Sequence, residues 1–510
     1  MICLALAALT FAENRKALDT YRPWIRMAEL RVDRLRHDLV RESGTFMNLA
    51  NAELGIRFIV TLRLINDGGA WAHGETERHE SMLTILNSCQ KGTVAYVDIE
   101  GDTDWPDVEE RAAALGAGII RSYHNFSGTP ANLVDIAHKL QQRPADVAKI
   151  AVMARGSVDL LAIFTLAEQL RETGRPFIAV GMGPFGTPTR ILAHWMGCLL
   201  TYASSALQGH VPAAPGHMDP QLLAEQFRYY EIQQTTKIFG IIGNPVMHSR
   251  SPSFHNPRFR DANLDAVYLH FQVDDLAAFF ALSQRLAIQG VSVTIPHKEA
   301  VLPYLSTSDE LVHQIGACNT LIRRGSGWYG TNTDAPGFFH PLQGLLDGEQ
   351  RNRAVVIGAG GAARAIVQAL LSHGFSILLL NRTLDRATQM ADDFGSHYPG
   401  MVEVANLPVP TKGQAPVVEP DLAAKVRTYA QLIVQTTSIG MQGEGEGDDP
   451  LYFHVFDGTE IVYDIIYTPP LTPILIRAQE SGCRILNGWP MFEEQALLQS
   501  RLFIEAIKTR

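Results

Sequence analysis

Eight short apolar runs recur through the first 205 residues, and they constrain the fold of this chain more than any other feature. They start about 25–30 residues apart and lie at 2–8, 27–33, 57–63, 93–99, 118–126, 147–154, 177–183 and 199–205. Helix-like stretches such as ANLVDIAHKLQQ separate most of them. Near-continuous apolar strands that alternate with helices are typical of a parallel sheet covered on its outer side. Eight such units in about 230 residues predict a closed (β/α)8 barrel.

Charged and polar side chains interrupt these otherwise apolar strands. They are Glu29, Arg31, Arg63, Asp98, Glu100, His124 and Lys149. A charge that points into a core costs several kcal/mol unless it is paired or belongs to a site. For any one of them alone, a satisfied buried ion pair is the simpler interpretation. Because barrels of this type carry their chemistry at the carboxyl ends of the strands, the set as a whole predicts one pocket.

Lys149 is the most informative member of this set, since it lies mid-run in VAKIAVMA with apolar neighbours. Apolar surroundings disfavour the charged form of an amine, and a neutral amine can attack a ketone to form a Schiff base. His124, at the end of its strand, can move protons near neutral pH. A lysine, a histidine and several arginines for an anionic substrate together predict a dehydration or aldol-type site.

The second half opens with the apolar strand KIFGIIG and the loop GNPVMHSRSP, after which a helix is expected to start near Pro252. Ser249 and Ser251 place two hydroxyls in this loop. They could simply cap the helix. Alternatively, they could bind a carboxylate or hydroxyl group near the positive end of the helix dipole.

Three further motifs, GVSVTIPHKE, GACNT and GTNTD, place polar residues on separate strand ends. These residues are Thr294, Lys298, Asn319 and Asp334. Alone, Lys298 could be a surface charge and Asp334 a helix N-cap. Together they favour a site in which a Lys–Asp pair moves a proton beside a polyol, while Asn319 and Thr294 hold hydroxyl groups.

The segment RAVVIGAGGAARAIVQALLSHG carries the clearest single motif. A strand at 353–357 runs into a glycine turn, then a helix rich in alanine, then the strand SILLLNRT. Glycines at such a turn let the backbone approach a pyrophosphate, which lies on the helix N-terminus. Ala363 replaces the last glycine, as the pattern permits. The residues predicted to hold a dinucleotide here are Gly358, Gly360, Gly361 and Ala362.

The end of the next strand bears on the choice of dinucleotide. An NAD site would normally carry Asp or Glu there, to bond the ribose 2′-hydroxyl. This chain has Asn381, Arg382 and Thr383 instead, with Arg386 one turn further on. Arginines attract a 2′-phosphate, so we expect NADP; the simpler alternative is an exposed arginine at a helix start.

The first half resembles a known family. The segments ELRVD, TLRLINDGG, SYHNF, AKIAVMA, GMGPFGTPTR and AAPGH are similar to those of type I 3-dehydroquinate dehydratases, over about residues 1–230. That family is a (β/α)8 barrel that converts 3-dehydroquinate to 3-dehydroshikimate through a lysine imine. The resemblance implies that Lys149 forms the Schiff base and His124 is the general acid and base. It implies a substrate site with Arg190 on the carboxylate, made of Glu29, Arg31, Arg63, Arg190 and His217.

This half departs from the family pattern in two places. Asp67 stands where the family has Glu, which keeps the charge but is shorter by one methylene. Ala213 and His217 stand around the PG pair where the family often has Ser and Gln. The first change bears on the support of His124, and the second on a loop contact to the substrate hydroxyls.

The second half resembles shikimate dehydrogenase over about residues 237–510. The motifs are GNPVMHSRSPSFHN, GVSVTIPHK, GACNT, GTNTD, GAGGAARA, NRT, QTTSIGM, DIIYTP and NGWPMFEEQ. The resemblance implies that Lys298 and Asp334 are the catalytic pair and that Met491 lies near the nicotinamide. It implies shikimate ligands at Ser249, Ser251, Thr294, Asn319, Asp334, Tyr467 and Gln495. Ser292 and Gln435 stand where many members have Asn, which leaves the preference for shikimate or quinate open.

Composition excludes some function classes. The net charge of −10 comes from 53 acidic and 43 basic residues, so no broad cationic face is expected and nucleic acid is a poor partner. The five cysteines form no CxxC pair, which disfavours a disulfide framework or a zinc site and fits a reducing cytosol. The start, MICLALAALTF, lacks the basic region of a signal peptide and is too short to cross a bilayer, which favours a buried strand over a targeting signal.

The predicted architecture is α/β throughout, with a boundary at the polar run 233–236. It consists of a barrel at 1–230, a substrate domain at 237–334 joined by a C-terminal helix at about 490–510, and a Rossmann-like NADP domain at 335–489. The two halves would dehydrate 3-dehydroquinate and then reduce 3-dehydroshikimate to shikimate with NADPH, in the cytoplasm and away from membranes. The alternatives are a quinate/shikimate dehydrogenase working oxidatively, or a catalytically silent regulator with both folds. No metal site is predicted, and the oligomeric state is left open.

Overall fold

The computed structural model describes residues 1–141, 143, 146–207, 214–346, 352–408, 418–443 and 445–508. Ala213, one of the predicted departures, lies outside the described residues. The chain divides into two compact units, Met1–Ile288 and Gln289–Arg510. Within the part of the chain just defined, no helix has the length and apolarity that a membrane crossing requires.

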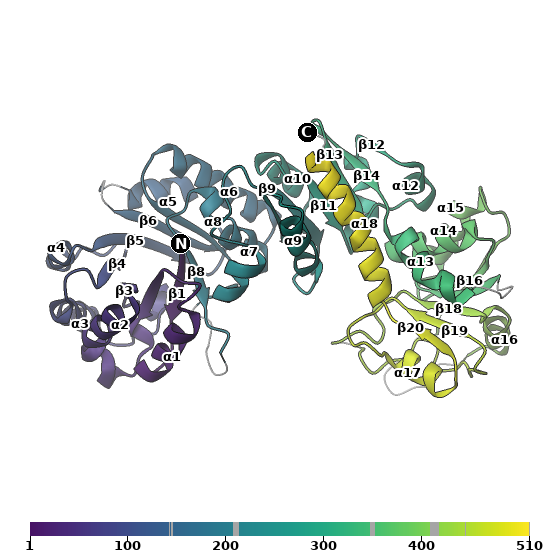
Figure 1. Ribbon diagram of the computed structural model, residues 1–510, viewed down its shortest axis with the longest axis horizontal. Helices are drawn as coiled ribbons and strands as arrows, with labels where there is room; N and C mark the ends of the chain where they lie inside the picture. Colours follow the sequence, from purple (N-terminus) through teal and green to yellow (C-terminus); the bar gives the residue numbers. More distant parts are fainter. Residues whose placement is uncertain are drawn as a thin grey trace. The chain divides into compact units, whose positions relative to one another are not determined.

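The first unit begins with an eight-stranded parallel sheet that curves into a barrel (Figure 1). The strands are β1 Ile2–Leu6, β2 Met27–Arg31, β3 Arg57–Thr61, β4 Val94–Glu100, β5 Gly118–Asn125, β6 Val147–Met153, β7 Phe177–Met182 and β8 Thr201–Ser204. Their order is β7-β6-β5-β4-β3-β2-β1-β8, so β8 lies beside β1. At the remaining seam, the Leu199 amide donates to the Phe177 carbonyl (2.9 Å). The predicted barrel is therefore confirmed, and each strand falls within one of the predicted runs or one residue beyond it.

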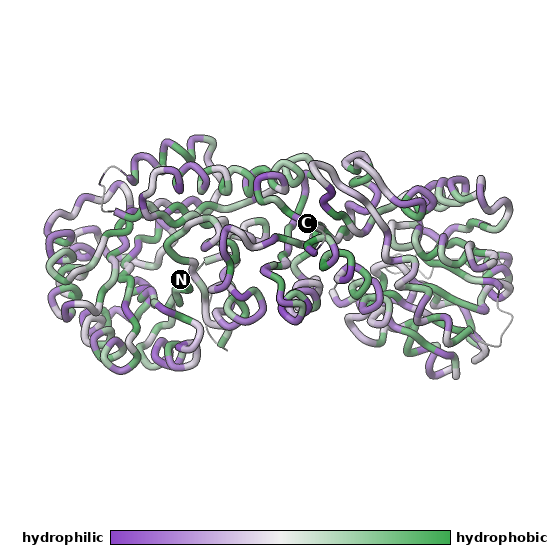
Figure 2. The backbone as a smooth tube through the Cα atoms, turned by 45° about the horizontal axis from the view of Figure 1, so that its top comes forward, coloured by the Kyte–Doolittle hydropathy of each residue, from purple (hydrophilic) through white to green (hydrophobic). Residues whose placement is uncertain are grey.

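Helices follow the barrel strands and cover them on the outside. They are α1 Phe11–Tyr21, η1 Val32–Arg34, η2 His37–Glu42, α2 Ser43–Leu54, η3 Ile65–Asp67, α3 Glu75–Ser88, α4 Pro106–Leu115, α5 Leu133–Leu140, α6 Ser157–Glu172, α7 Gly183–Ile191 and α8 Ala193–Met196. Local sequence fixes several ends: Thr10 and Glu13 form a capping box at α1. In Figure 2 the inner stretches of the barrel are largely hydrophobic, and hydrophilic colour gathers on the outer turns of the tube.

The first unit continues beyond the barrel to Ile288. It adds η4 Leu222–Gln226, β9 Lys237–Gly243, α9 Ser251–Asp261, β10 Ala266–Gln272 and α10 Leu276–Arg285. Strands β9 and β10 pair in parallel. Asp274, just before α10, accepts hydrogen bonds from the amide and the hydroxyl of Ser157 (both 2.8 Å) and so caps α6 of the barrel. Arg285 pairs with Glu168 of α6 (2.6 Å).

The second unit starts with a small mixed α/β portion. Its elements are β11 Gly290–Val293, α11 His297–Ala300, η5 Leu302–Tyr304, β12 Thr307–Ser308, α12 Glu310–Ile315, β13 Thr320–Arg324, β14 Gly327–Thr331 and α13 Asp334–Leu346. Strand β13 runs antiparallel to β11 and β14, and β12 is parallel to β14. Strands β11 and β14 end within the motifs GVSVTIPHKE and GTNTD, and β13 begins at GACNT.

A six-stranded parallel sheet in the order β17-β16-β15-β18-β19-β20 follows. The strands are β15 Arg353–Ile357, β16 Ser376–Asn381, β17 Val402–Asn406, β18 Leu432–Gln435, β19 Ile461–Asp464 and β20 Arg484–Leu486. The helices are α14 Gly361–Ser372, α15 Leu384–Gly395, α16 Pro420–Tyr429, α17 Pro473–Glu480 and α18 Trp489–Lys508. Alternate residues of β15 enter different cores: Val356 packs on one face and Val355 on the other. Apolar side chains on both faces explain the unbroken apolar run.

Helix α18 returns along the earlier part of this unit. Gln499 on α18 accepts a hydrogen bond from Ser292 of β11 (2.7 Å) and donates one to Thr320 of β13 (2.8 Å). Gly337 of α13 faces Gln495 so closely that a Cβ there would lie 2.7 Å from the Gln495 Cβ. The absence of a side chain at Gly337 thus lets the two helices approach each other.

Candidate active sites

Lys149 of β6 lies in the barrel interior with only 4% of its surface exposed. Its Nζ donates to Asp98 Oδ2 (2.7 Å) and lies 3.7 Å from Glu29 Oε1. The ring of Tyr202 lies 4.3 Å from the same nitrogen. Two carboxylates and an aromatic face thus hold the amine at a fixed point inside the barrel.

Asp98 of β4 connects this lysine to other polar groups. Its Oδ1 accepts hydrogen bonds from Arg63 Nη2 (2.7 Å) and from the hydroxyl of Ser122 (2.6 Å). Burial opposes ionisation of this carboxyl, but the charges of Arg63 and Lys149 outweigh it and hold the pKa of Asp98 well below its usual range. The carboxylate is therefore ionised, and it fixes two cations and a hydroxyl at once.

His124, near the end of β5, lies close to these cations. Burial, and then the positive charges of Arg63 and Lys149, lower the pKa of its imidazole well below the ordinary value. Its Nδ1 is buried and has no hydrogen-bond partner in the described structure. The imidazole is therefore neutral at pH 7 and free to take a proton.

The residues at the end of β2 are held in a different way. Arg31 makes a bidentate pair with Asp33 through Nε to Oδ1 (3.0 Å) and Nη2 to Oδ2 (2.7 Å). Glu29 accepts a hydrogen bond from the hydroxyl of Thr61 (2.8 Å). Both residues are buried and already paired, so they line the site as ordered charges.

Arg190 differs from the other buried arginines because no acidic partner accompanies it in the described residues. It is fully buried, its Nη2 donates to the Pro215 carbonyl (3.0 Å), and its Nε has no partner there. Burial lowers the pKa of its guanidinium to about 9. A buried, uncompensated guanidinium is strongly stabilised by an incoming carboxylate.

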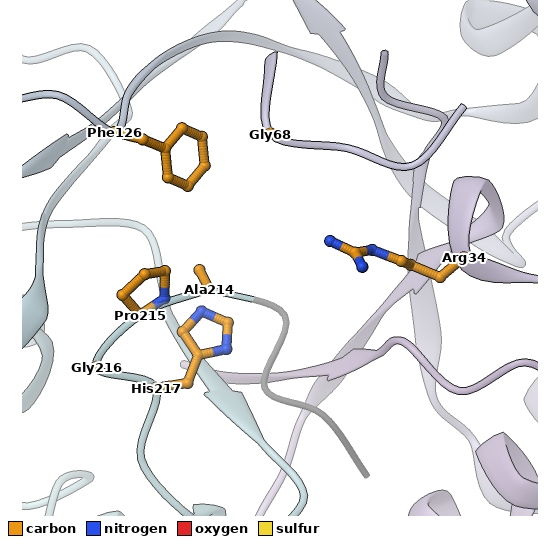
Figure 3. A pocket seen from close by; sticks show the side chains of 7 residues that line it. All are labelled: Arg34, Gly68, Phe126, Ala214, Pro215, Gly216 and His217. Atoms are coloured by element: carbon orange, nitrogen blue, oxygen red, sulfur yellow. The ribbon is translucent and has the colours of Figure 1, made fainter. Parts of the chain in front are cut away.

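A cavity of about 430 Å³ lies beside Pro215, the residue whose carbonyl Arg190 contacts (Figure 3). Its lining is Arg34, Gly68, Phe126, Ala214, Pro215, Gly216 and His217. Figure 3 shows Arg34 and His217 reaching toward the space from different loops. His217 pairs with the hydroxyl of Ser204, and burial together with the charge of Arg190 lowers the pKa of its imidazole well below the ordinary value.

The structure clarifies the first departure from the family pattern. Asp67 lies in η3, and burial raises the pKa of its carboxyl. Because Nδ1 of His124 has no partner in the described structure, Asp67 does not hydrogen-bond to that nitrogen. Sequence reasoning placed Asp98 in the set of strand charges that predicts one pocket, but gave it no role of its own. The available signal was its position on β4, which only β5 separates from the strand of Lys149.

In the second unit, Lys298 and Asp334 form the predicted pair. Lys298 Nζ donates to Asp334 Oδ2 (2.6 Å), and the side chains are 12% and 7% exposed. Asn319 donates to the other oxygen of Asp334 (2.8 Å). Thr294 lies half-buried just after β11, four residues before Lys298. The three motifs thus converge, and the carboxylate orients the ammonium group.

Two other predicted substrate ligands lie on or against α18. The ring of Tyr467 lies 5.4 Å from that of Phe492, between ring centroids. Gln495 donates from its amide nitrogen to the carbonyl of Phe492 (3.1 Å). Sequence reasoning missed Gln499, which bonds to Ser292 and so accounts for the serine at that position. The signal was a polar residue on the buried face of an amphipathic helix.

In the first unit, Ser249 and Ser251 lie together at the start of α9. Their hydroxyl groups are 3.1 Å apart, and the hydroxyl of Ser249 accepts a hydrogen bond from the Ser251 amide (3.2 Å). The Ser249 carbonyl contacts the ring of His270 (2.9 Å). The loop therefore places both hydroxyls at the beginning of an eleven-residue helix.

The glycine turn after β15 fits a dinucleotide. Gly358 has a φ of +108°, and a Cβ there would lie 2.5 Å from the hydroxyl of Thr436. At Gly360 a Cβ would meet nothing within 4 Å, so the backbone at the start of α14 is open to a phosphate. Gly361 lies against Lys298, since a Cβ there would be 2.9 Å from the lysine Cβ. Ala362 follows in the first turn of α14.

The end of β16 carries the residues predicted to select the cofactor. Asn381 donates to the carbonyl of Thr383 (2.8 Å), which shapes the turn into α15. Arg382 is exposed, and Arg386 pairs with Glu299 (3.4 Å) although both are largely exposed. Met491, at the start of α18, packs into the core formed with α13 and α14.

Gln435, the second departure in this half, has a structural role. Its side chain bonds to the amide of Thr437 (3.0 Å) and to the carbonyl of Ile439 (2.9 Å). It therefore holds the loop after β18 in place, next to the glycine turn that Thr436 contacts.

These sites define a class of protein: a barrel enzyme with a buried lysine, joined in one chain to a dinucleotide-dependent oxidoreductase. Three family models match in order: type I 3-dehydroquinase (2–234), shikimate dehydrogenase substrate binding domain (241–321) and shikimate/quinate 5-dehydrogenase (343–409). A chloroplastic bifunctional 3-dehydroquinate dehydratase/shikimate dehydrogenase of Arabidopsis thaliana is 30% identical over 456 residues, which cover 86% of this chain and 71% of that protein. The chain therefore belongs to the family of bifunctional 3-dehydroquinate dehydratase/shikimate dehydrogenases.

Other relatives match the second half. An NADP(+) shikimate dehydrogenase of a Nostoc species is 37% identical over 277 residues, or 53% of this chain and 91% of the relative. A solved shikimate 5-dehydrogenase of Thermus thermophilus, in complex with NADP(H) and shikimate, is 30% identical and covers 54% of this chain and 99% of its own, with a TM-score of 0.44. The protein is a shikimate-pathway enzyme that combines a lyase with an NADP-dependent oxidoreductase.

Proposed function

We propose that Lys149 carries the dehydration of 3-dehydroquinate as an imine, and that Lys298 serves the reduction of 3-dehydroshikimate to shikimate. One observation carries the first assignment: the Lys149 amine is held 2.7 Å from Asp98 inside a barrel that also buries an arginine, Arg190, without an acidic partner among the described residues. If Lys149 had only a structural role, there would be no reason to bury a second cation, Arg190, at the cost of leaving it without an acidic partner.

In the proposed first step, the Lys149 ammonium group loses a proton to the neutral His124, and the amine formed attacks the substrate ketone. His124 then returns the proton to the resulting hydroxyl, which leaves as water when the protonated imine forms. The protonated imine acts as an electron sink, so the neutral His124 can take the proton on the adjacent carbon. The imidazolium then returns this proton to the departing hydroxyl, which leaves as water. Hydrolysis of the imine frees 3-dehydroshikimate and restores the amine.

Arg190 is proposed to bind the substrate carboxylate. Its unpaired guanidinium gains a charge-assisted hydrogen-bond partner when the substrate arrives, whereas the other arginines of the site are already paired. Glu29, Arg31, Arg63 and His217 would then surround the ring hydroxyls.

In the second half, Lys298 is proposed to donate the proton that the substrate oxygen takes up on reduction. When bound, NADPH supplies the hydride. Asp334 orients the ammonium group and, with Asn319 and Thr294, would hold the hydroxyl groups of the ring. For four further residues the assignment as shikimate ligands rests on the family resemblance: Ser249, Ser251, Tyr467 and Gln495.

For NADP, the proposed holders are the glycine turn and the residues that follow β16. The open backbone at Gly360 would take the pyrophosphate, with Gly358, Gly361 and Ala362 around it. Arg382 and Arg386 would attract the 2′-phosphate beside Asn381 and Thr383, and Met491 would border the nicotinamide.

We further propose a cytosolic enzyme whose partners are its small-molecule substrates. All five cysteines are buried and unpaired, which is compatible with a reducing compartment.

Borohydride trapping tests the imine directly. The full chain is incubated with 3-dehydroquinate and borohydride, digested, and analysed by mass spectrometry. We expect an adduct on the peptide that contains Lys149, and none in a Lys149→Met variant. The matched control is Lys298→Met, which leaves the barrel amine in place and should still form the adduct. Recovery of dehydration without any adduct in the native chain would contradict the mechanism.

A further inference from the structure

A group of metal-ligating side chains lies outside both active sites. Nε2 of His37 is 2.9 Å from Glu77 Oε1, and Nδ1 of His73 is 3.8 Å from Glu77 Oε2. Each of the three residues offers a ligand atom within 4.8 Å of the other two, the only such group of three in the described chain. All three are exposed, so an ion could reach them from solvent.

These separations suit a tetrahedral divalent ion. With bonds of about 2.0–2.2 Å to nitrogen and oxygen, tetrahedral ligands lie about 3.3–3.6 Å apart, between the two separations found here. The imidazole rings of His37 and His73 are also close, with centroids 4.2 Å apart. Rings this close together can present their nitrogens to one shared ion.

The ligands come from two loops that neighbouring interactions hold in place. His37 starts η2 after β2, while His73 and Glu77 flank the start of α3 after β3. Asp33, at the end of β2, accepts a hydrogen bond from the Ala70 amide (2.9 Å), which ties the loops together. The buried ring of Trp71 then lies 5.0 Å from His73 and 5.8 Å from His37, measured between centroids. The rings therefore converge before any ion binds.

We propose that His37, His73 and Glu77 form a binding site for Zn²⁺ or a similar transition-metal ion, with water as the fourth ligand. Two imidazoles and one carboxylate are a ligand set that zinc accepts, and three protein ligands leave one position open. A bound ion would link the loop after β2 to the loop after β3. These loops also carry Arg34 and Gly68, which line the cavity at the barrel mouth.

Metal titration of the full chain tests the site. After chelator treatment, Zn²⁺ binding is measured by calorimetry, and Co²⁺ is added as a spectroscopic probe of tetrahedral geometry. We expect one tight site per chain and visible Co²⁺ absorption typical of a tetrahedral ion. His73→Ala and Glu77→Gln should each weaken Zn²⁺ binding by about 100-fold and abolish this absorption.

A nearby pair provides the matched control. His79, on the same helix, contacts Asp107 at 2.8 Å with no third ligand in the described residues. His79→Ala should leave Zn²⁺ affinity unchanged. Dehydratase activity without added metal serves as a folding control. We expect it to be unchanged in His73→Ala and Glu77→Gln. The proposal is overturned if the native chain binds no Zn²⁺ or if binding survives in both ligand variants.

Discussion

The buried cations of the barrel differ in whether they have an acidic partner. Lys149 and Arg63 share the carboxylate of Asp98, and Arg31 is paired with Asp33, but Arg190 has no acidic partner in the described residues. A buried cation without a counter-charge costs stability until an anion arrives. The paired cations are thus neutralised internally, whereas Arg190 keeps a charge that the carboxylate of the substrate would neutralise in the proposed function.

The environment of His124 predicts the pH dependence of dehydration. Because burial and two nearby cations lower the pKa of its imidazole, protonation sets in only at a pH below the ordinary 6.5. A base must be neutral to take a proton, so the acid limb of kcat/KM should be centred below pH 6.5. Steady-state kinetics between pH 4.5 and 8 measure this. An acid limb centred at pH 6.5 or above would contradict it.

The ion pair of Arg386 suggests a test of the cofactor site, in which Glu299 competes with the 2′-phosphate of NADPH for Arg386. Glu299 lies 3.4 Å from Arg386, so it should compete with the 2′-phosphate for the same charge. We expect Glu299→Gln to lower the KM for NADPH about two- to threefold at low salt, since an exposed pair contributes about 1 kcal/mol or less. Arg386→Gln should raise it. A Lys425→Gln variant, at another exposed pair, should leave it unchanged.

If the KM for NADPH is the same in the Glu299→Gln, Arg386→Gln and Lys425→Gln variants as in the native chain, Arg386 does not bind the cofactor. The KM for NADH provides a second check, since a residue that acts on the 2′-phosphate should leave it unaltered.

At the scale of elements, the sequence predicted strands and helices better than the contacts between them. The barrel strands and the glycine turn follow from local patterns of apolar residues and glycines. The partner of Lys149 does not, because Asp98 is 51 residues away and its pairing depends on two strands lying at the right register. Likewise, Gln499 reaches Thr320 across 179 positions of the sequence.

The N-terminus of α6 gives a test at this scale. Its first amide, on Ser157, donates to Asp274, 117 residues later. Asp274→Ala should destabilise the first unit by about 1 kcal/mol, as expected for a lost N-cap, and should speed hydrogen exchange at the Ser157 amide. Denaturant unfolding and exchange mass spectrometry measure the two effects. Asp261→Ala, at an exposed carboxylate on α9, should change neither; equal effects would contradict the capping role.

At the scale of the whole molecule, the proposed function assigns one lysine to each reaction, and the two lysines lie in different units. Lys149 belongs to the first unit and Lys298 to the second. We expect Lys149→Met to abolish dehydration and leave shikimate oxidation within about twofold, and Lys298→Met to do the reverse. Separate assays of the two reactions, followed by a coupled assay from 3-dehydroquinate, measure this.

Loss of both activities in either variant would contradict independent sites. Retention of both activities in both variants would show that neither amine carries its reaction, whereas a native chain without either activity would favour a regulator that only binds the metabolites.

The cap on α6 also bears on how such a chain can be divided. A dehydratase cut off at residue 236 would keep all eight strands but lose the aspartate that closes the start of α6 and the arginine that pairs with Glu168. The first amide of α6, the helix that follows the strand of Lys149, would then lose its hydrogen-bond acceptor. The barrel therefore depends on residues that follow the sequence boundary. If the gene were split there, the separate barrel would need substitutions that replace these two contacts.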